Sequence, residues 1–222
     1  MTAEAICATD TPTSASHFAQ VLADWWTQPD SARVALWCSA EYQEQVTALW
    51  EEVVESSADP LRAMLSTLAG EPENSLASEY ERLFVGPAAV PCPPYEAVWR
   101  TDRPKHEQGT VMGSSTLAVK QLYGELGIRL RPGQAELPDH IAIEFEALAV
   151  ALAVAERHNA EKLLRALRMW VPELCCSVMN ESSVQFYRDV AGITREAMLS
   201  KSFESLVGNP QQVSVVKQSL QQ

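Results

Sequence analysis

The chain has few basic residues and no long apolar run. It contains 17 Lys and Arg residues against 29 Asp and Glu residues, which gives a formal net charge of −12 over 222 residues. A chain with this net negative charge repels nucleic acid and anionic lipid, so we expect neither as a partner. The longest apolar run, 147–155, is far shorter than the ~20 residues of a membrane-spanning helix. We therefore expect no stable membrane insertion.

The sequence also lacks the short motifs of common catalytic and cofactor sites. It has no Gly-x-Ser-x-Gly nucleophile elbow, no phosphate-binding Gly-x4-Gly-Lys-Ser/Thr string, and no Cys-x-x-Cys pair among its five cysteines. The N-terminal segment shows no basic stretch followed by an apolar one, so nothing marks the chain for export and the expected location is the cytoplasm. We predict no catalytic residue, no cofactor and no metal ion, with reduced thiols.

Helical spacing of apolar residues dominates the chain, and no alternating strand pattern or hairpin turn appears. The predicted fold class is all-α, a single globular, bundle-like helical domain over 14–207. A disordered N-terminus, 1–13, and a polar tail, 208–222, flank it. Helices are expected at 14–29, 41–57, 59–70, 74–84, 110–126, 138–156, 160–170, 172–181 and 183–207. Five tryptophans at helical spacing are predicted core residues: Trp25, Trp26, Trp37, Trp50 and Trp170.

A proline-rich loop, residues 86–99, interrupts this helical pattern. Gly86 and Pro87 end the preceding helix, and the loop carries four prolines together with Tyr95, Val98 and Trp99. Such a loop is stiff before anything binds, so its apolar side chains can form a preorganised groove. The pattern predicts a binding surface for an apolar segment.

A second candidate site precedes the most apolar helix. Glu136, Pro138, Asp139 and His140 fall together, and Pro138 is the expected first residue of that helix. Neighbouring carboxylates favour protonated His140 whereas the helix dipole disfavours it, so an adjustable charge is expected. The alternative is that Pro138 and Asp139 only cap a helix, with His140 in an ordinary hydrogen bond. A metal set of Glu136, His140 and Glu144 is disfavoured because Pro138 places Glu136 outside the helix.

Three segments together resemble the TorD/DmsD family of redox-enzyme maturation chaperones. They are Tyr80-Glu81-Arg82-Leu83-Phe84-Val85-Gly86-Pro87, then Pro93-Pro94-Tyr95 followed by Val98-Trp99, and Glu136-x-x-Asp139-His140. A further segment resembles the sequences of the dimethyl sulfoxide reductase branch of that family, namely Gly113-Ser114-Ser115-Thr116-Leu117-Ala118. The resemblance covers about residues 75–150.

The resemblance implies an all-helical, non-enzymatic protein that binds the twin-arginine signal peptide of a molybdenum-cofactor oxidoreductase. The partner would be that peptide together with the body of the reductase, and the chaperone would be a monomer or a helix-swapped dimer. The family's peptide-binding positions fall on Tyr80, Leu83, Phe84, Pro93, Pro94, Tyr95, Asp139 and His140. We add Trp99, Glu136 and Glu144, because the peptide combines arginines with an apolar stretch. The alternative function is a generic helical protein-interaction module with a different client.

Overall fold

The computed structural model describes residues 12–68, 70–71, 73–86, 89–106, 112–130 and 136–208. Within these ranges the regular secondary structure is helical, and one isolated antiparallel bridge takes the place of any strand. The all-α fold class is therefore confirmed. Most of the predicted N-terminal segment and tail, and the start of the helix predicted at 110–126, lie outside the described residues, so the domain boundaries remain a prediction.

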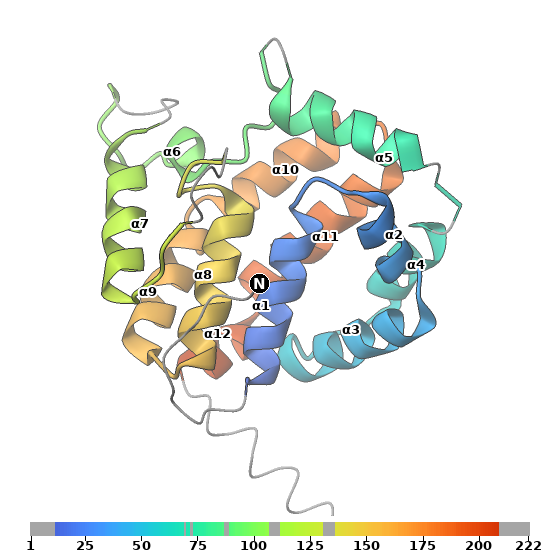
Figure 1. Ribbon diagram of the computed structural model, residues 1–222, viewed down its shortest axis with the longest axis horizontal. Helices are drawn as coiled ribbons and strands as arrows, with labels where there is room; N and C mark the ends of the chain where they lie inside the picture. Colours follow the sequence, from blue (N-terminus) through green and yellow to red (C-terminus); the bar gives the residue numbers. More distant parts are fainter. Residues whose placement is uncertain are drawn as a thin grey trace, which may run out of the picture.

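The helices follow one another along the chain, and the longest connections precede α6, α7 and α8 (Figure 1). In chain order they are α1 (Ser14–Trp25), α2 (Ser31–Trp37), α3 (Ala40–Val53), α4 (Asp59–Leu68), α5 (Glu73–Tyr80), the π-helical turn η1 (Glu81–Val85), α6 (Glu96–Trp99), α7 (Ser114–Glu125), α8 (Ile141–Ala153), α9 (Arg157–Arg168), α10 (Val171–Glu181), α11 (Gln185–Leu199) and α12 (Lys201–Gly208).

Two helices form the centre of the molecule. In Figure 1, α1 lies in the middle of the view beside α8, and these two helices pack along one another. Ten of the thirteen residues of α8 are buried, as its nearly uniform apolar sequence predicts. Around this pair, α1 also contacts α3 and α12, α8 contacts α9, and α10 pairs with α11. The site described below lies where α8 begins.

The core is rich in aromatic side chains. Phe18 of α1 meets Trp50 and Phe203 edge to face, at ring-centroid distances of 6.0 and 5.6 Å. All five tryptophans predicted as core residues are at most 2% exposed, which confirms that prediction. Edge-to-face contacts of this kind stabilise a packed core beyond the apolar area that they bury.

The start of α8 differs from the prediction. The helix begins at Ile141 and not at Pro138, and His140 is its N-cap residue in an extended conformation. Pro138 lies instead in a turn closed by a hydrogen bond from the His140 N–H to the Leu137 carbonyl, of 3.1 Å. Proline suits the second position of a turn as well as the first turn of a helix, so the sequence alone does not distinguish the two.

Two other helices also depart from their predicted course. The helix predicted at 183–207 divides at Ser200, whose extended backbone ends α11 and whose hydroxyl accepts a hydrogen bond from the Phe203 N–H at the start of α12. The helix predicted to reach Phe84 as a regular α-helix ends in η1, where the Gly86 N–H donates to the Glu81 carbonyl over 2.7 Å. This wider turn changes the direction in which the last residues point.

Candidate functional site

A pocket of about 370 Å³ opens between the end of α5, the proline-rich loop and the turn before α8. We call it the aromatic pocket, and its lining residues are Tyr80, Phe84, Val85, Val90, Pro93, Pro94, Tyr95, Val98, Glu136 and His140. The lining combines apolar side chains with one carboxylate.

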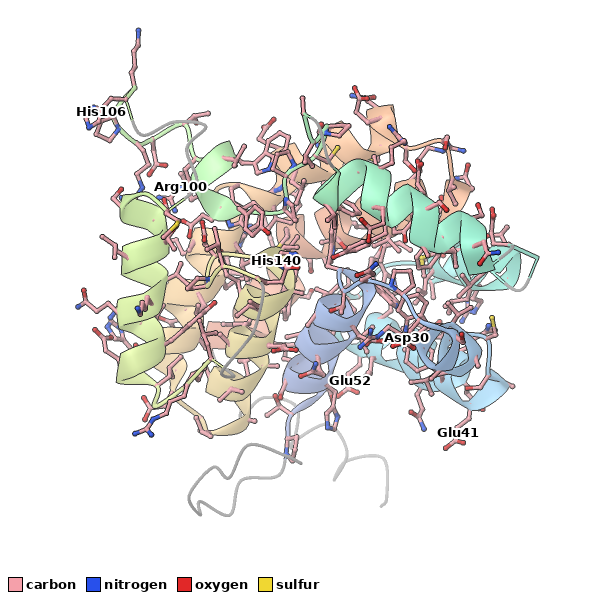
Figure 2. All side chains as sticks on the ribbon, turned by 45° about the horizontal axis from the view of Figure 1, so that its top comes forward. Asp30, Glu41, Glu52, Arg100, His106 and His140 are labelled. Carbon is pink, nitrogen blue, oxygen red and sulfur yellow. The ribbon has the colours of Figure 1, made fainter. Side chains whose placement is uncertain are left out.

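Backbone pairing brings the two predicted segments together. Tyr95 and His140 form the isolated antiparallel bridge, and on either side of it the Glu96 N–H donates to the Asp139 carbonyl and the Ile141 N–H to the Pro94 carbonyl, each over 2.9 Å. Figure 2 shows His140 where the chain enters α8, below the segment that leads to Arg100. The two stretches that the family resemblance assigns to one peptide-binding site therefore lie side by side in the structure.

Tyr80 and Phe84 form the aromatic floor of the pocket. Their ring centroids are 5.0 Å apart, and Phe84 also packs against Trp26 at 5.7 Å and Tyr187 at 5.9 Å. The Tyr80 hydroxyl donates a 3.3 Å hydrogen bond to the Trp26 carbonyl. Both side chains are only 4% exposed, so the floor is continuous with the core of the protein.

Tyr95, Glu136 and His140 form the polar wall of the pocket. The Tyr95 hydroxyl donates a 2.7 Å hydrogen bond to Glu136 Oε2, and the same oxygen lies 4.0 Å from His140 Nε2. The Tyr95 and His140 rings meet edge to face at 5.4 Å. Burial, and then the hydrogen bond to Glu136, raise the pKa of the Tyr95 phenol, which therefore stays protonated.

His140 is held neutral. Burial lowers the pKa of its imidazole to about 4, and the opposing effect of Glu136 is smaller. Its Nδ1 accepts a 3.2 Å hydrogen bond from the Ala142 N–H, as an N-cap side chain does, which places the remaining proton on Nε2. The adjustable charge expected from the sequence does not arise near neutral pH, because the cost of burying the imidazolium exceeds the attraction of the carboxylate.

Two further predicted carboxylates are buried outside the pocket lining. Asp139 and Glu144 have no exposed surface. Asp139 Oδ2 accepts a hydrogen bond from the Ala97 N–H at 3.2 Å. Burial raises the pKa of Glu144 well above its usual range, and the charges of Glu96 and Asp139 add to the shift. Of the three predicted carboxylates, Glu136 is the one that lines the pocket.

Leu83 and Trp99 also support the pocket from outside its lining. Leu83 is fully buried, and its carbonyl accepts a 3.0 Å hydrogen bond from the Cys92 N–H. The Trp99 indole N–H donates a 2.6 Å hydrogen bond to the Pro93 carbonyl. Both residues fix the path of the proline-rich loop. Seven of the eleven predicted site residues thus line the pocket, and whether any of them binds a peptide remains a prediction.

The pocket also contains three valines that we did not include among the site residues. Val85 lies in η1, Val90 in the proline-rich loop and Val98 in α6. Val85 is 46% exposed, which is unusual for an apolar side chain next to the aromatic floor. Val98 follows Tyr95 by three residues, a spacing that places two side chains on the same face of a helix. We predicted no helix in this segment, so Val98 was not included. Nothing in the sequence indicated the π-helical turn that presents Val85.

The described residues contain no cluster of His, Cys, Asp and Glu side chains suited to holding a metal ion. Within the same part of the chain, no helix combines the length and apolar character needed to cross a membrane.

Comparison with known proteins identifies the family. The family model of the nitrate reductase delta subunit matches residues 47–175, more than half of the chain. Tat proofreading chaperone DmsD of Salmonella typhi is 31% identical over 172 residues, 77% of this chain and 80% of the relative, and DmsD of Salmonella typhimurium is 32% identical over 173 residues with the same coverage. The chain belongs to the TorD/DmsD family of redox-enzyme maturation proteins.

A solved structure agrees with the TorD/DmsD fold. The crystal structure of an Archaeoglobus fulgidus protein, assigned as a redox enzyme maturation protein, superposes with a TM-score of 0.55 at 23% identity. The match covers 87% of this chain and 98% of that protein, which supports the helical architecture as a whole. The family's curated members named above are chaperones, so this TorD/DmsD member is a redox-enzyme maturation chaperone.

Proposed function

We propose that the protein binds the twin-arginine signal peptide of a molybdenum-cofactor oxidoreductase in the cytoplasm. It holds the reductase back from export while the enzyme folds and receives its cofactor, and it catalyses no reaction itself. The client is of the dimethyl sulfoxide or trimethylamine N-oxide reductase type. The names of the relatives support a client that uses the Tat pathway.

One observation carries the proposal, namely the convergence of Tyr80, Phe84, Tyr95, Glu136 and His140 on one pocket. A twin-arginine signal peptide has arginines followed by a weakly apolar stretch. The aromatic floor and valines offer apolar contact area, and Glu136 offers a charged acceptor. Because His140 is neutral near neutral pH, it does not compensate the carboxylate of Glu136 in the pocket lining.

The expected affinity is moderate. Three or four buried anchors at about 1.5–3 kcal/mol each give roughly 5–12 kcal/mol of gross binding free energy, and ordering the peptide takes back about 2–5 kcal/mol. With a contribution from charge, we expect a Kd of about 1 μM. Binding of that strength is reversible, as a chaperone that hands its client on requires.

Calorimetric titration with a panel of twin-arginine signal peptides tests the proposal. We expect the wild-type protein to bind at least one peptide, and Tyr95→Ala and His140→Ala to weaken that binding while circular dichroism shows retained helix. A wild-type protein that binds none of the panel would favour the generic interaction module with a different client. Affinity capture from an anaerobically grown native host, with identification of the bound protein, then names the client.

A further inference from the structure

The charges of the chain are unevenly distributed over the molecule. Residues 100–106, residues 112–130 and α9 together contain nine of the seventeen Lys and Arg residues, but only three of the twenty-nine Asp and Glu residues. The rest of the chain holds the other eight basic and twenty-six acidic residues. In Figure 1, α7 and α9 lie at the left of the molecule, and Figure 2 shows Arg100 and His106 on the same side. We call this part the basic end.

A groove of about 290 Å³ lies between α7 and α9 at the basic end. Its apolar lining comes from both helices, namely Ala118, Val119, Leu122, Leu163 and Ala166. A 3.5 Å ion pair between Lys162 and Glu125 joins the two helices, and both side chains are more than 40% exposed. An exposed pair of this kind adds at most about 1 kcal/mol, so an incoming group can replace it at small cost.

Exposed cationic and apolar side chains surround this groove. Arg165 lies one turn beyond Lys162 on α9, is exposed, and has no ion-pair partner in the part of the chain that the structure describes. Leu117 of α7 is 68% exposed, and Met169 at the end of α9 is 50% exposed. Each of these two residues lies within one helical turn of a lining residue. An apolar groove with this surround is typical of a surface that another protein covers.

The groove suits an acidic helix better than a nucleic acid or a lipid surface. Its described lining contains no aromatic side chain on which a base could stack, and the carboxylate of Glu125 repels phosphate groups. A helix with an apolar face can instead bury that face between α7 and α9. Acidic residues at the margins of such a helix would meet Lys162 and Arg165.

We propose that the groove between α7 and α9 binds an acidic, amphipathic helix of a partner protein, which goes beyond the proposed function. The groove and the aromatic pocket share no lining residue, although α6 contributes Arg100's neighbouring turn to one and Val98 to the other. A signal peptide and this second partner can therefore be bound at the same time. Because the rest of the chain is strongly acidic, it repels an acidic helix and directs its approach to the basic end.

Fluorescence anisotropy with a labelled synthetic helix tests this proposal. The probe is about 14 residues long, roughly four turns, with leucine and alanine on one face and glutamate on the other. A control peptide has lysine in place of every glutamate. We expect the acidic peptide to bind, the lysine peptide to bind at least about tenfold more weakly, and added salt to weaken the acidic complex.

Protein variants locate the binding site. The double variant Lys162→Glu with Arg165→Glu should lose about tenfold in affinity for the acidic peptide. Ala118→Trp fills the groove from an exposed position without a change of charge and should lose at least as much. Arg62→Glu on α4 reverses one exposed charge outside the groove and should change the affinity by less than about twofold. Circular dichroism shows whether each variant is folded.

Several outcomes would overturn the proposal. They are no binding of the acidic peptide at about 1 mM, equal binding of both peptides, or an unchanged affinity in Ala118→Trp. Tighter binding of duplex DNA or of phosphatidylglycerol vesicles would assign the basic end to phosphate groups instead. Self-association in sedimentation that Ala118→Trp abolishes would assign the groove to a second copy of the chain. Ala118→Trp should retain its affinity for a twin-arginine signal peptide, so either proposal can fail without the other.

Discussion

The carboxylate of Asp139 holds the first turn of α6 by accepting a 3.2 Å hydrogen bond from the backbone N–H of Ala97. The Asp139 carbonyl accepts a second bond, of 2.9 Å, from the neighbouring Glu96 N–H. Tyr95 precedes this turn and Val98 lies in it. Asp139 therefore positions two residues of the pocket lining, although it does not line the pocket itself. It is a positioning residue in this geometry.

Replacing Asp139 should therefore affect stability and binding together. Asp139→Ala leaves the buried Ala97 N–H without a partner, which costs about 1–3 kcal/mol in the free energy of unfolding. Peptide affinity should fall as well, because α6 loses its anchor, whereas Asp139→Asn retains an acceptor oxygen and should keep most of both properties. Urea denaturation and calorimetry measure the two effects. A loss of affinity with unchanged stability would show that Asp139 contacts the peptide directly.

His140 should make the protein less stable in mild acid. The folded-state pKa of about 4 lies below the ordinary value of 6.5, so the unfolded chain binds the proton more readily. The stability associated with neutral His140 is present above about pH 6.5 and is lost as the pH falls toward 4, by on the order of 3 kcal/mol in total. Urea midpoints between pH 4 and 8 measure this slope.

The variant His140→Asn is the matched control for this titration. Asparagine does not titrate and can still cap the Ala142 N–H. The slope between pH 4 and 6.5 should be shallower in the variant than in the wild type. An identical slope in both proteins would contradict a neutral, buried His140.

Glu144 should contribute a pH dependence of the opposite direction. Its pKa is raised in the folded state, so the folded protein retains a proton that the unfolded chain releases above about pH 4.3. The stability contributed by this group is full below that pH and declines as the pH rises. Glu144→Gln keeps a neutral side chain of similar shape, and its free energy of unfolding should vary less between about pH 5 and 8. If the variant also loses peptide affinity at constant stability, then Glu144 takes part in binding.

Removing only the hydroxyl of Tyr95 should leave Glu136 Oε2 without the hydrogen bond that this hydroxyl donates. Tyr95→Phe deletes the 2.7 Å hydrogen bond but keeps the ring against His140, so stability should fall by only about 0.5–1.5 kcal/mol. Peptide affinity should be retained or should rise slightly, because Glu136 loses a competing donor. Tyr95→Ala, which also removes the ring, should bind several-fold more weakly in the same calorimetric titration. Equal losses in both variants would mean that the hydroxyl itself contacts the peptide.

Much of the fold could be predicted because helices are marked by the spacing of apolar residues, which is a local property of the sequence. Apolar spacing located most of the helices, and the uniformly apolar sequence of 141–153 indicated the central position of α8. The tryptophans of the core were predictable for the same reason. The convergence of the proline-rich loop with the turn before α8 followed from the family resemblance and not from any local pattern.

The details that the sequence did not reveal depend on contacts between distant residues. Pro138 fits a turn as well as a helix start, and only the pairing of Tyr95 with His140 decides between them. Asp139 is buried against α6, a single turn of helix inside a loop in which we expected none, and it accepts a hydrogen bond from the Ala97 N–H of that turn. Charge patterns along a chain do not reveal which carboxylates end up under a neighbouring segment.

The π-helical turn η1 links the shape of the pocket to one backbone hydrogen bond. Its Glu81-to-Gly86 hydrogen bond encloses one residue more than a regular helical turn would. The extra residue is accommodated inside the turn, so the directions of Phe84 and Val85 depend on this bonding pattern as well as on their own side chains. A backbone detail of five residues thereby decides which apolar surface the cleft offers.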